Sequence, residues 1–182
     1  MLRMSLRGLL GGLALACAAC AHAGDEAPDL VLRGSIAGKD HQTYRSLPFE
    51  VPAGVDRITV AFDYSGHEQA HTTIDLGLLG PAGFRGQGGF RGWSGGSKQL
   101  FTVGDTDATP SYLPGEIRPG RWTLVLGVPN IRAREHASYT ARIWFGHPGD
   151  PPWEPAVLNP PLRTAPGWYR GDLHMHTGHS DG

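Results

Sequence analysis

Residues 57–64 read Arg-Ile-Thr-Val-Ala-Phe-Asp-Tyr, and this stretch decides the fold class. Its apolar residues recur at every second position, so an extended strand places them all on one face. The turn sequence Pro52-Ala53-Gly54 precedes it. A period of two bounded by turn residues predicts a β-strand with one face in a core. The predicted buried residues are Ile58, Val60, Phe62 and Tyr64.

The same alternation continues on both sides of this stretch. Further strands are predicted at 73–78, 99–103, 121–128 and 139–145, and another ends with Phe49 and Val51. The predicted inward residues of the first and third are Ile74, Leu76, Leu78, Trp122, Leu124, Leu126 and Val128. Helical spacing is not sustained anywhere from Leu30 to Phe145. Seven or eight such strands predict a mainly β protein, an antiparallel β-sandwich of jelly-roll or immunoglobulin-like type. The alternation leaves the strand order open.

One segment of the predicted sandwich, Gly80–Gly96, is dense in glycine and carries Phe84, Phe90 and Trp93. We interpret it as a long flexible connection between strands, and an aromatic loop for a glycan or substrate is the alternative. Its glycines do not follow the G-x-G-x-x-G pattern, so no dinucleotide cofactor is expected.

Two smaller groups of candidate ligands lie in predicted loops. Asp105-Thr106-Asp107 lacks the spaced acids of a calcium loop and is interpreted as a solvated turn. His67 and His71 would share a face only on a helix, which their surroundings do not predict. Both histidines are therefore expected to be loop residues.

The N-terminus has the pattern of an export signal. Arg3 and Arg7 precede an uncharged, largely apolar run from Gly8 to Ala21. Ala21-His22-Ala23 then matches an A-x-A cleavage site, so residues 1–23 are expected to be removed. The mature protein would be periplasmic or extracellular, with no integral membrane segment.

Both cysteines, Cys17 and Cys20, fall inside this predicted signal. Cleavage after Ala23 would leave no thiol and no disulfide, which excludes a cysteine nucleophile. The alternative is lipid anchoring through Cys17, because Ala14-Leu15-Ala16-Cys17 loosely resembles a lipobox.

The charge balance bears on possible partners. The chain has 16 basic and 17 acidic residues without a basic stripe, so no nucleic-acid partner is expected. The sequence leaves the oligomeric state open.

The sequence from Asp172 to Gly182, Asp-Leu-His-Met-His-Thr-Gly-His-Ser-Asp-Gly, concentrates metal-binding side chains. In an extended strand Asp172, His174 and His176 would project from one face. Gly178 and Gly182 could let Asp181 return toward the same metals. The donors are then imidazole nitrogen and carboxylate oxygen, without sulfur.

These eleven residues resemble the first metal-binding motif of the PHP (polymerase and histidinol phosphatase) superfamily, D-L-H-x-H-T-x-x-S-D-G. The lead-in from Gly167 to Gly171 resembles a secreted branch of that superfamily, in which a β-rich region precedes the metallohydrolase domain. The resemblance implies that His174, His176 and Asp181 are metal ligands and that Asp172 orients a histidine from behind. His179 falls at a variable position of the pattern.

The resemblance also implies an architecture and an activity. Residues 24–146 would form the sandwich, 147–167 a proline-rich linker, and 168–182 the start of a truncated PHP β/α barrel. Two or three zinc, manganese or iron ions would activate water against a phosphoester, amide or carbamate in a small molecule. The chain alone is expected to be inactive, with its catalytic residues unidentified, because it holds one motif. The alternative is a β-sandwich binding module with a vestigial histidine cluster.

Overall fold

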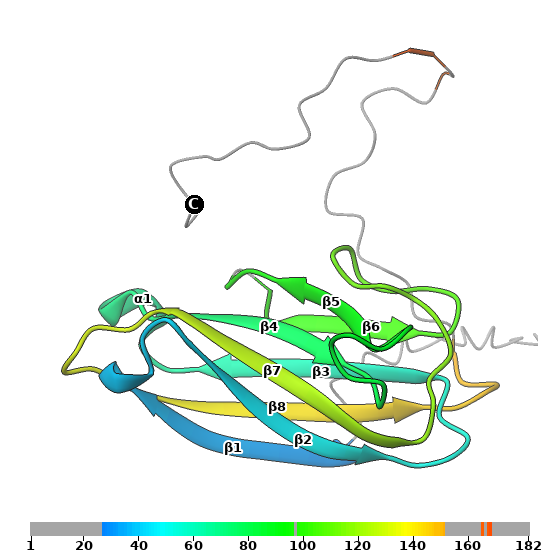
Figure 1. Cartoon of the computed structure of the whole chain (residues 1–182), viewed down its shortest axis with the longest axis horizontal. Helices are drawn as coiled ribbons and strands as arrows, with labels where there is room; N and C mark the ends of the chain where they lie inside the picture. Colours follow the sequence, from blue (N-terminus) through cyan, green and yellow to red (C-terminus); the bar gives the residue numbers. More distant parts are fainter. Residues whose placement is uncertain (1–26, 97, 152–164, 166, 169–182) are drawn as a thin grey trace, which may run out of the picture. The chain divides into compact units, whose positions relative to one another are not determined.

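The computed structural model describes residues 27–96, 98–151, 165, 167 and 168. Within them eight strands form two four-stranded sheets (Figure 1). The strands are β1 (Leu30–Ala37), β2 (Thr43–Val51), β3 (Arg57–Tyr64), β4 (Thr73–Leu79), β5 (Phe90–Ser94), β6 (Leu100–Gly104), β7 (Gly120–Asn130) and β8 (His136–Gly146). A 3-10 turn, η1 (Gly38–Asp40), follows β1, and one helical turn, α1 (His67–Ala70), follows β3.

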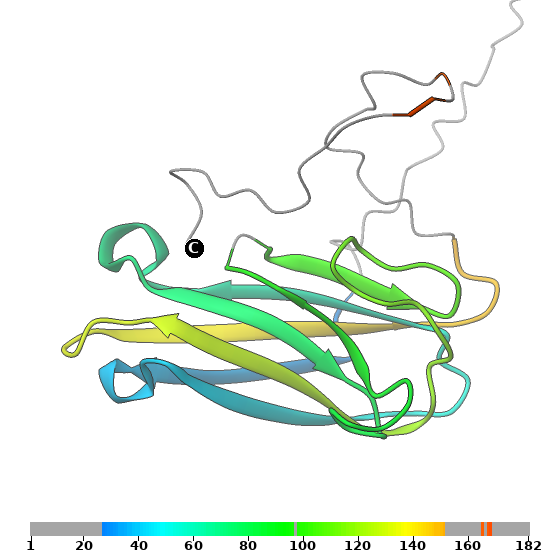
Figure 2. The ribbon, with the colours of Figure 1, turned by 45° about the horizontal axis from the view of Figure 1, so that its top comes forward.

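The strand order is that of a jelly roll. Sheet A has the order β1-β8-β3-β6 and sheet B the order β2-β7-β4-β5, with every pair antiparallel (Figures 1 and 2). The first half of the chain thus pairs with the second half in reverse order, from β1 with β8 to β4 with β5. This confirms the predicted antiparallel sandwich and resolves the open alternative in favour of the jelly roll.

The core lies between the two sheets and includes the inward residues predicted for β3, β4 and β7, except that Tyr64 of β3 is only partly buried. Trp122, Leu124, Leu126 and Val128 of β7 are at most 1% exposed. Ile58, Val60 and Phe62 of β3 and Ile74, Leu76 and Leu78 of β4 are buried to the same degree. Each such side chain contributes about 1.5–3 kcal/mol of hydrophobic stabilisation. This core forms without a disulfide in residues 27–151, where the sequence has no cysteine.

Strand β5 corrects the interpretation of Gly80–Gly96 as a connection. Turns fill residues 81–89, but Phe90–Ser94 is an edge strand of sheet B. Leu79 pairs with Phe90 and Gly77 with Trp93, so β5 has one residue more than β4 over this span. This is a β-bulge, and Gly92, with φ of 126°, lies inside it. The strand was not predicted from the sequence because its glycines interrupt the alternation of apolar and polar residues.

The region after β3 brings a second correction. His67 lies in α1, so the expected loop contains one helical turn. His71 caps that turn in the left-handed region with φ of 51°. The ring of His67 packs edge-on against Tyr64, 5.7 Å between centroids. A single turn this short leaves no periodicity in the sequence that could predict it.

The chain divides between Asp150 and Pro151 into two units, and the sandwich belongs to the first. The predicted signal peptide, most of the predicted linker and the predicted metal-binding motif lie outside the described residues. In the part of the chain that is described, no helix has the length and apolar character needed to span a bilayer.

Candidate functional site

The residues predicted to bind metal lie outside the described part of the chain. This holds for Asp172, His174, His176, His179 and Asp181. Within residues 27–96 and 98–151, no group of three or more His, Cys, Asp or Glu side chains could hold a metal ion. The candidate site that the structure itself offers is therefore on the sandwich.

The outer face of sheet B carries a tryptophan packed onto bare backbone. Trp93 pairs with Gly77 and faces away from the core. A Cβ atom at Gly77 would lie 2.4 Å from its ring, and one at Gly127 of β7 would lie 2.7 Å from it. The six-membered ring of Trp93 thus occupies the space that two side chains would otherwise fill. Two glycines on neighbouring strands position this one indole.

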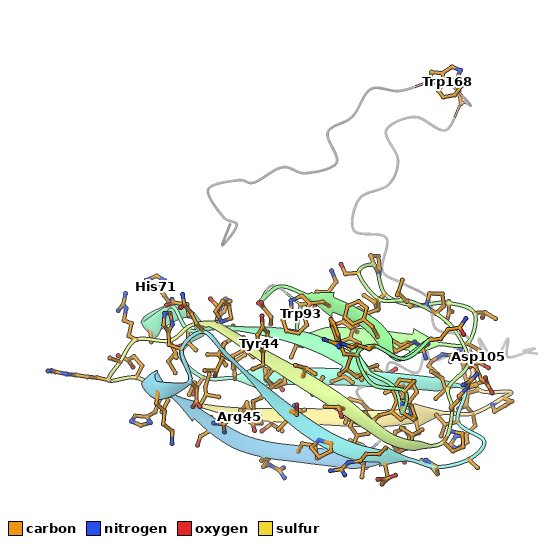
Figure 3. The ribbon with its side chains drawn as sticks, viewed as in Figure 1. Tyr44, Arg45, His71, Trp93, Asp105 and Trp168 are labelled. Atoms are coloured by element: carbon orange, nitrogen blue, oxygen red, sulfur yellow. The ribbon has the colours of Figure 1, made fainter. Side chains whose placement is uncertain are left out.

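Tyr44 of β2 completes an aromatic pair with Trp93. The two ring centroids are 5.9 Å apart and the planes are inclined by 69°, an edge-to-face contact. Tyr44 is 76% exposed, so its ring stands almost free of the fold. Figure 3 labels both side chains, one on β2 and the other on β5. These two strands are opposite edges of sheet B, yet their side chains meet over β7 and β4.

A hollow of about 250 Å³ lies beside Tyr44 on this face. Its polar lining residues include Gln42 and Asp75. Asp75 pairs with Gly127, whose Cβ position lies 3.4 Å from that of Asp75. The hollow is lined by Gln42, Thr43, Tyr44, Asp75, Gly127, Val128 and Pro129. We call this hollow together with Tyr44 and Trp93 the aromatic face.

The carboxylate of Asp75 also contributes to the pKa values of two tyrosines. Burial raises the pKa of Tyr112 in the core, and the Asp75 carboxylate adds to that rise. Burial likewise raises the pKa of Tyr64, with a smaller contribution from the same carboxylate. The aromatic face therefore combines two aromatic rings with one anionic group.

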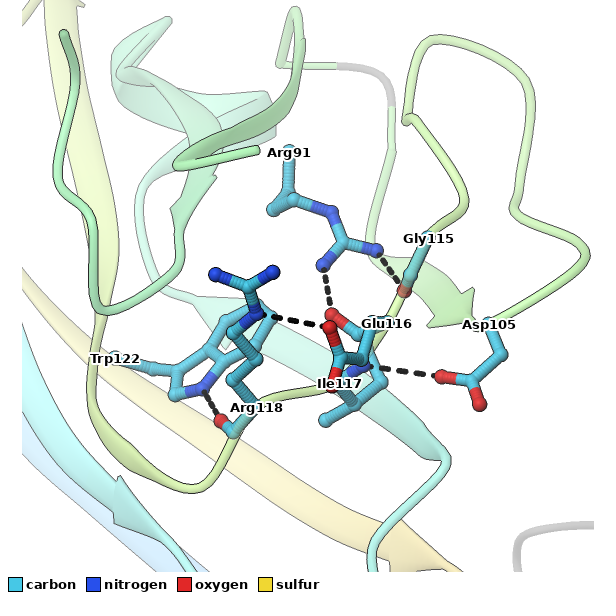
Figure 4. Close-up of polar contacts among 7 residues, drawn as sticks. All are labelled: Arg91, Asp105, Gly115, Glu116, Ile117, Arg118 and Trp122. Atoms are coloured by element: carbon cyan, nitrogen blue, oxygen red, sulfur yellow. Dashed lines mark hydrogen bonds and ion pairs between the residues drawn. The ribbon is translucent and has the colours of Figure 1, made fainter. Parts of the chain in front are cut away.

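Arg91 of β5, two residues before Trp93, holds a long loop against the core (Figure 4). Its side chain is 3% exposed and stands 5.4 Å above the ring of Trp122. The guanidinium donates hydrogen bonds to the carbonyls of Leu113 (3.1 Å), Gly115 (2.7 Å) and Glu116 (3.2 Å). Burial lowers the pKa of Arg91, and the Asp105 carboxylate opposes this effect. With its hydrogen bonds made to backbone, Arg91 has a structural role.

Asp105 belongs to the same structural arrangement. Its Oδ1 accepts a hydrogen bond from the Ile117 N–H at 3.0 Å (Figure 4). Asp107 accepts one from the Gly104 N–H through its backbone carbonyl at 2.8 Å. The Asp105–Asp107 segment is thus a turn, as predicted from its spacing.

The aromatic residues predicted in Gly80–Gly96 separate into two groups. Phe84 and Phe90 pack edge-to-face with centroids 5.6 Å apart, whereas Trp93 contacts Tyr44. Sequence reasoning missed Tyr44 because it lies 49 positions before Trp93 in the chain. The signal that could have found it is alternation, since Tyr44 falls on the opposite face from Phe49 and Val51.

No protein-family model matches the chain, and no curated protein shows significant similarity to it.

Proposed function

We propose that the chain is the N-terminal part of an exported metal-dependent hydrolase of the PHP type. The observation that carries the proposal is the sequence Asp172–Gly182, which matches the PHP motif at each of its specified positions. The A-x-A site at Ala21-His22-Ala23 supports export to the periplasm or beyond. The jelly roll would then be a folded module ahead of the catalytic domain.

The donor set of the motif fits a hydrolytic metal centre. His174 and His176 offer imidazole nitrogens and Asp181 a carboxylate, a combination suited to zinc, manganese or iron. Asp172 would hold one histidine in its metal-binding tautomer by accepting its other N–H. A metal bound there lowers the pKa of water and so supplies hydroxide at neutral pH. Three ligands are too few for two or three metals, so residues 24–182 alone should be inactive.

An activity assay tests this proposal. A protein extended beyond Gly182 along the same reading frame should hydrolyse a nitrophenyl phosphate or an aryl carbamate when supplied with zinc, manganese or iron. The substitution His176→Ala should abolish turnover and reduce bound metal, because it removes a ligand. His147→Ala is the matched control, since His147 is an exposed histidine outside the motif.

Two results would contradict the proposal. One is the absence of metal-dependent turnover in the extended protein with every substrate class. The other is full activity after His176→Ala. Turnover by residues 24–182 alone would contradict only the expectation that the chain needs further ligands.

The second candidate function is a binding module in which the sandwich is the active part. The aromatic face favours it, because Tyr44 presents a large ring to solvent with 76% of its surface exposed. The nucleotide sequence after the Gly182 codon separates the candidates: further His and Asp motifs favour the hydrolase, and an immediate stop codon favours the module. Binding by such a module would be insensitive to chelators.

A further inference from the structure

Gly77 and Gly127, the two glycines under Trp93, are required by the position of its ring and not by their backbone conformation. A glycine inside a strand costs about 0.5–1 kcal/mol relative to alanine. Gly77 and Gly127 are both in strand interiors, and neither is among the residues with positive φ. Their backbone conformations could therefore accept a side chain, and the ring of Trp93 is what excludes one. The sheet keeps these two positions bare in order to seat an indole on its outer surface.

Tyr44 adds a ring that the fold does not bury. Its contact with Trp93 is edge-to-face, so the flat surface of one ring is not covered by the other. Tyr44 is more exposed than any other large hydrophobic residue of the sandwich. Exposed aromatic rings held in place by a rigid sheet present apolar area at little conformational cost.

The polar groups next to these rings narrow the ligand chemistry. Asp75 and Gln42 are the acidic and amide residues that line the hollow beside Tyr44. A carboxylate repels phosphate and other anions, and it accepts hydrogen bonds from hydroxyl groups. The ligand should thus have an apolar face for the rings and neutral hydroxyls for the carboxylate.

We propose that the aromatic face of sheet B binds neutral carbohydrate, with the C–H face of a pyranose ring against Trp93 and Tyr44 and its hydroxyls toward Asp75. The hollow of about 250 Å³ is smaller than the roughly 300–1,000 Å³ of enclosed ligand sites. Binding is therefore shallow and suits a sugar polymer on a surface better than a free monosaccharide. This site does not depend on the proposed hydrolase.

Polysaccharide binding by the exported chain tests the proposal. The probes are cellulose, chitin and galactan, measured by co-sedimentation and by quenching of tryptophan fluorescence. At least one polymer should bind, and Trp93→Ala or Tyr44→Ala should weaken binding about tenfold or more. Asp75→Asn should weaken it less, because the amide keeps one acceptor. Tyr44→Ala removes an exposed ring, so its effect does not depend on folding.

The matched control is Phe84→Ala, because Phe84 is 71% exposed and its ring packs against Phe90, whereas Tyr44 and Trp93 pack against each other. Its binding should equal that of the unchanged protein. EDTA should leave binding unchanged, which separates this result from failure or success of the hydrolase assay. Binding to none of the three polymers, or equal binding after Tyr44→Ala, would overturn the proposal. So would binding of choline in place of sugar, which would assign the two rings and Asp75 to a cation.

Discussion

Arg91 and Trp93 lie two residues apart on strand β5, yet one belongs to the core and the other to the outer surface. Arg91 is 3% exposed and bonds three backbone carbonyls. Trp93 packs on the solvent side over Gly77 and Gly127. A regular strand would place both on one face, and the bulge at Gly92 separates them. One irregular residue thus lets a five-residue strand stabilise a loop on one face and build a surface on the other.

The largest effect is expected from removing the inward side chain. Arg91→Met would leave the carbonyls of Leu113, Gly115 and Glu116 without their buried donors. The free energy of unfolding should fall by about 3–5 kcal/mol, measured by urea denaturation. Arg118→Met is the control, because Arg118 forms an exposed ion pair with Glu116 and should change stability by less than about 1 kcal/mol. Equal losses in the free energy of unfolding of the two variants would show that the burial of Arg91 does not cause its stabilising effect.

An intermediate effect is expected on the outer face. Gly77→Ala places a Cβ atom 2.4 Å from the Trp93 ring, so the indole must move. Stability should fall by about 1–3 kcal/mol, with a shift in tryptophan fluorescence. Combining Gly77→Ala with Trp93→Ala should remove most of that loss, since the clash disappears. Gly95→Ala, with open space around its Cβ, should change neither quantity. If the double variant keeps the full loss of stability, the backbone conformation requires Gly77 and the Trp93 ring does not.

The smallest effect is expected from Asp40 in η1, a charged residue that is far from β5 in the sequence. Asp40 accepts hydrogen bonds from the Ala37 N–H and from Arg45, both at 2.8 Å. The Ala37 hydrogen bond, with Arg45 nearby, lowers the pKa of Asp40 below its ordinary value of 3.8. A lowered folded pKa adds stability above the ordinary value, and that stability is lost as the pH falls through the folded pKa.

Asp40→Asn should accordingly destabilise the sandwich by about 1 kcal/mol at pH 7, and by less as the pH falls below 4. Thermal unfolding at pH 7 and at pH 3 measures the difference. A loss that stays the same at both pH values would contradict the role of the charge. The loss of stability caused by Arg91→Met provides the comparison. It should be the same at both pH values, because arginine remains protonated at pH 3 and at pH 7.

Alternation of apolar residues predicted most of the fold. Strand β3 was predicted with its observed bounds, and the inward residues of β4 and β7 are buried as expected. Strand β5 was missed because Gly92 and the bulge remove the period of two on which such a prediction depends. The turn α1 was missed because four residues are too few to show a helical period.

The candidate site was less accessible to sequence reasoning than the fold. Trp93 was singled out within a glycine-rich segment, but its partners Tyr44, Gly77 and Gly127 come from three other strands. Nothing in the local sequence marks these three as neighbours. The motif with His174, His176 and Asp181 shows the opposite case, because all its members lie within a few positions of one another.

By itself the sequence determined the antiparallel β class and many of the inward residues, and it located the predicted metal-binding motif, since each depends on spacing along the chain. Only the tertiary structure decided the jelly-roll order, the opposite directions of Arg91 and Trp93, and the aromatic face on sheet B. The physical reason is that the same alternation suits many strand orders. Which side chains meet across a sheet depends on register, and register depends on long-range pairing and on the bulge at Gly92.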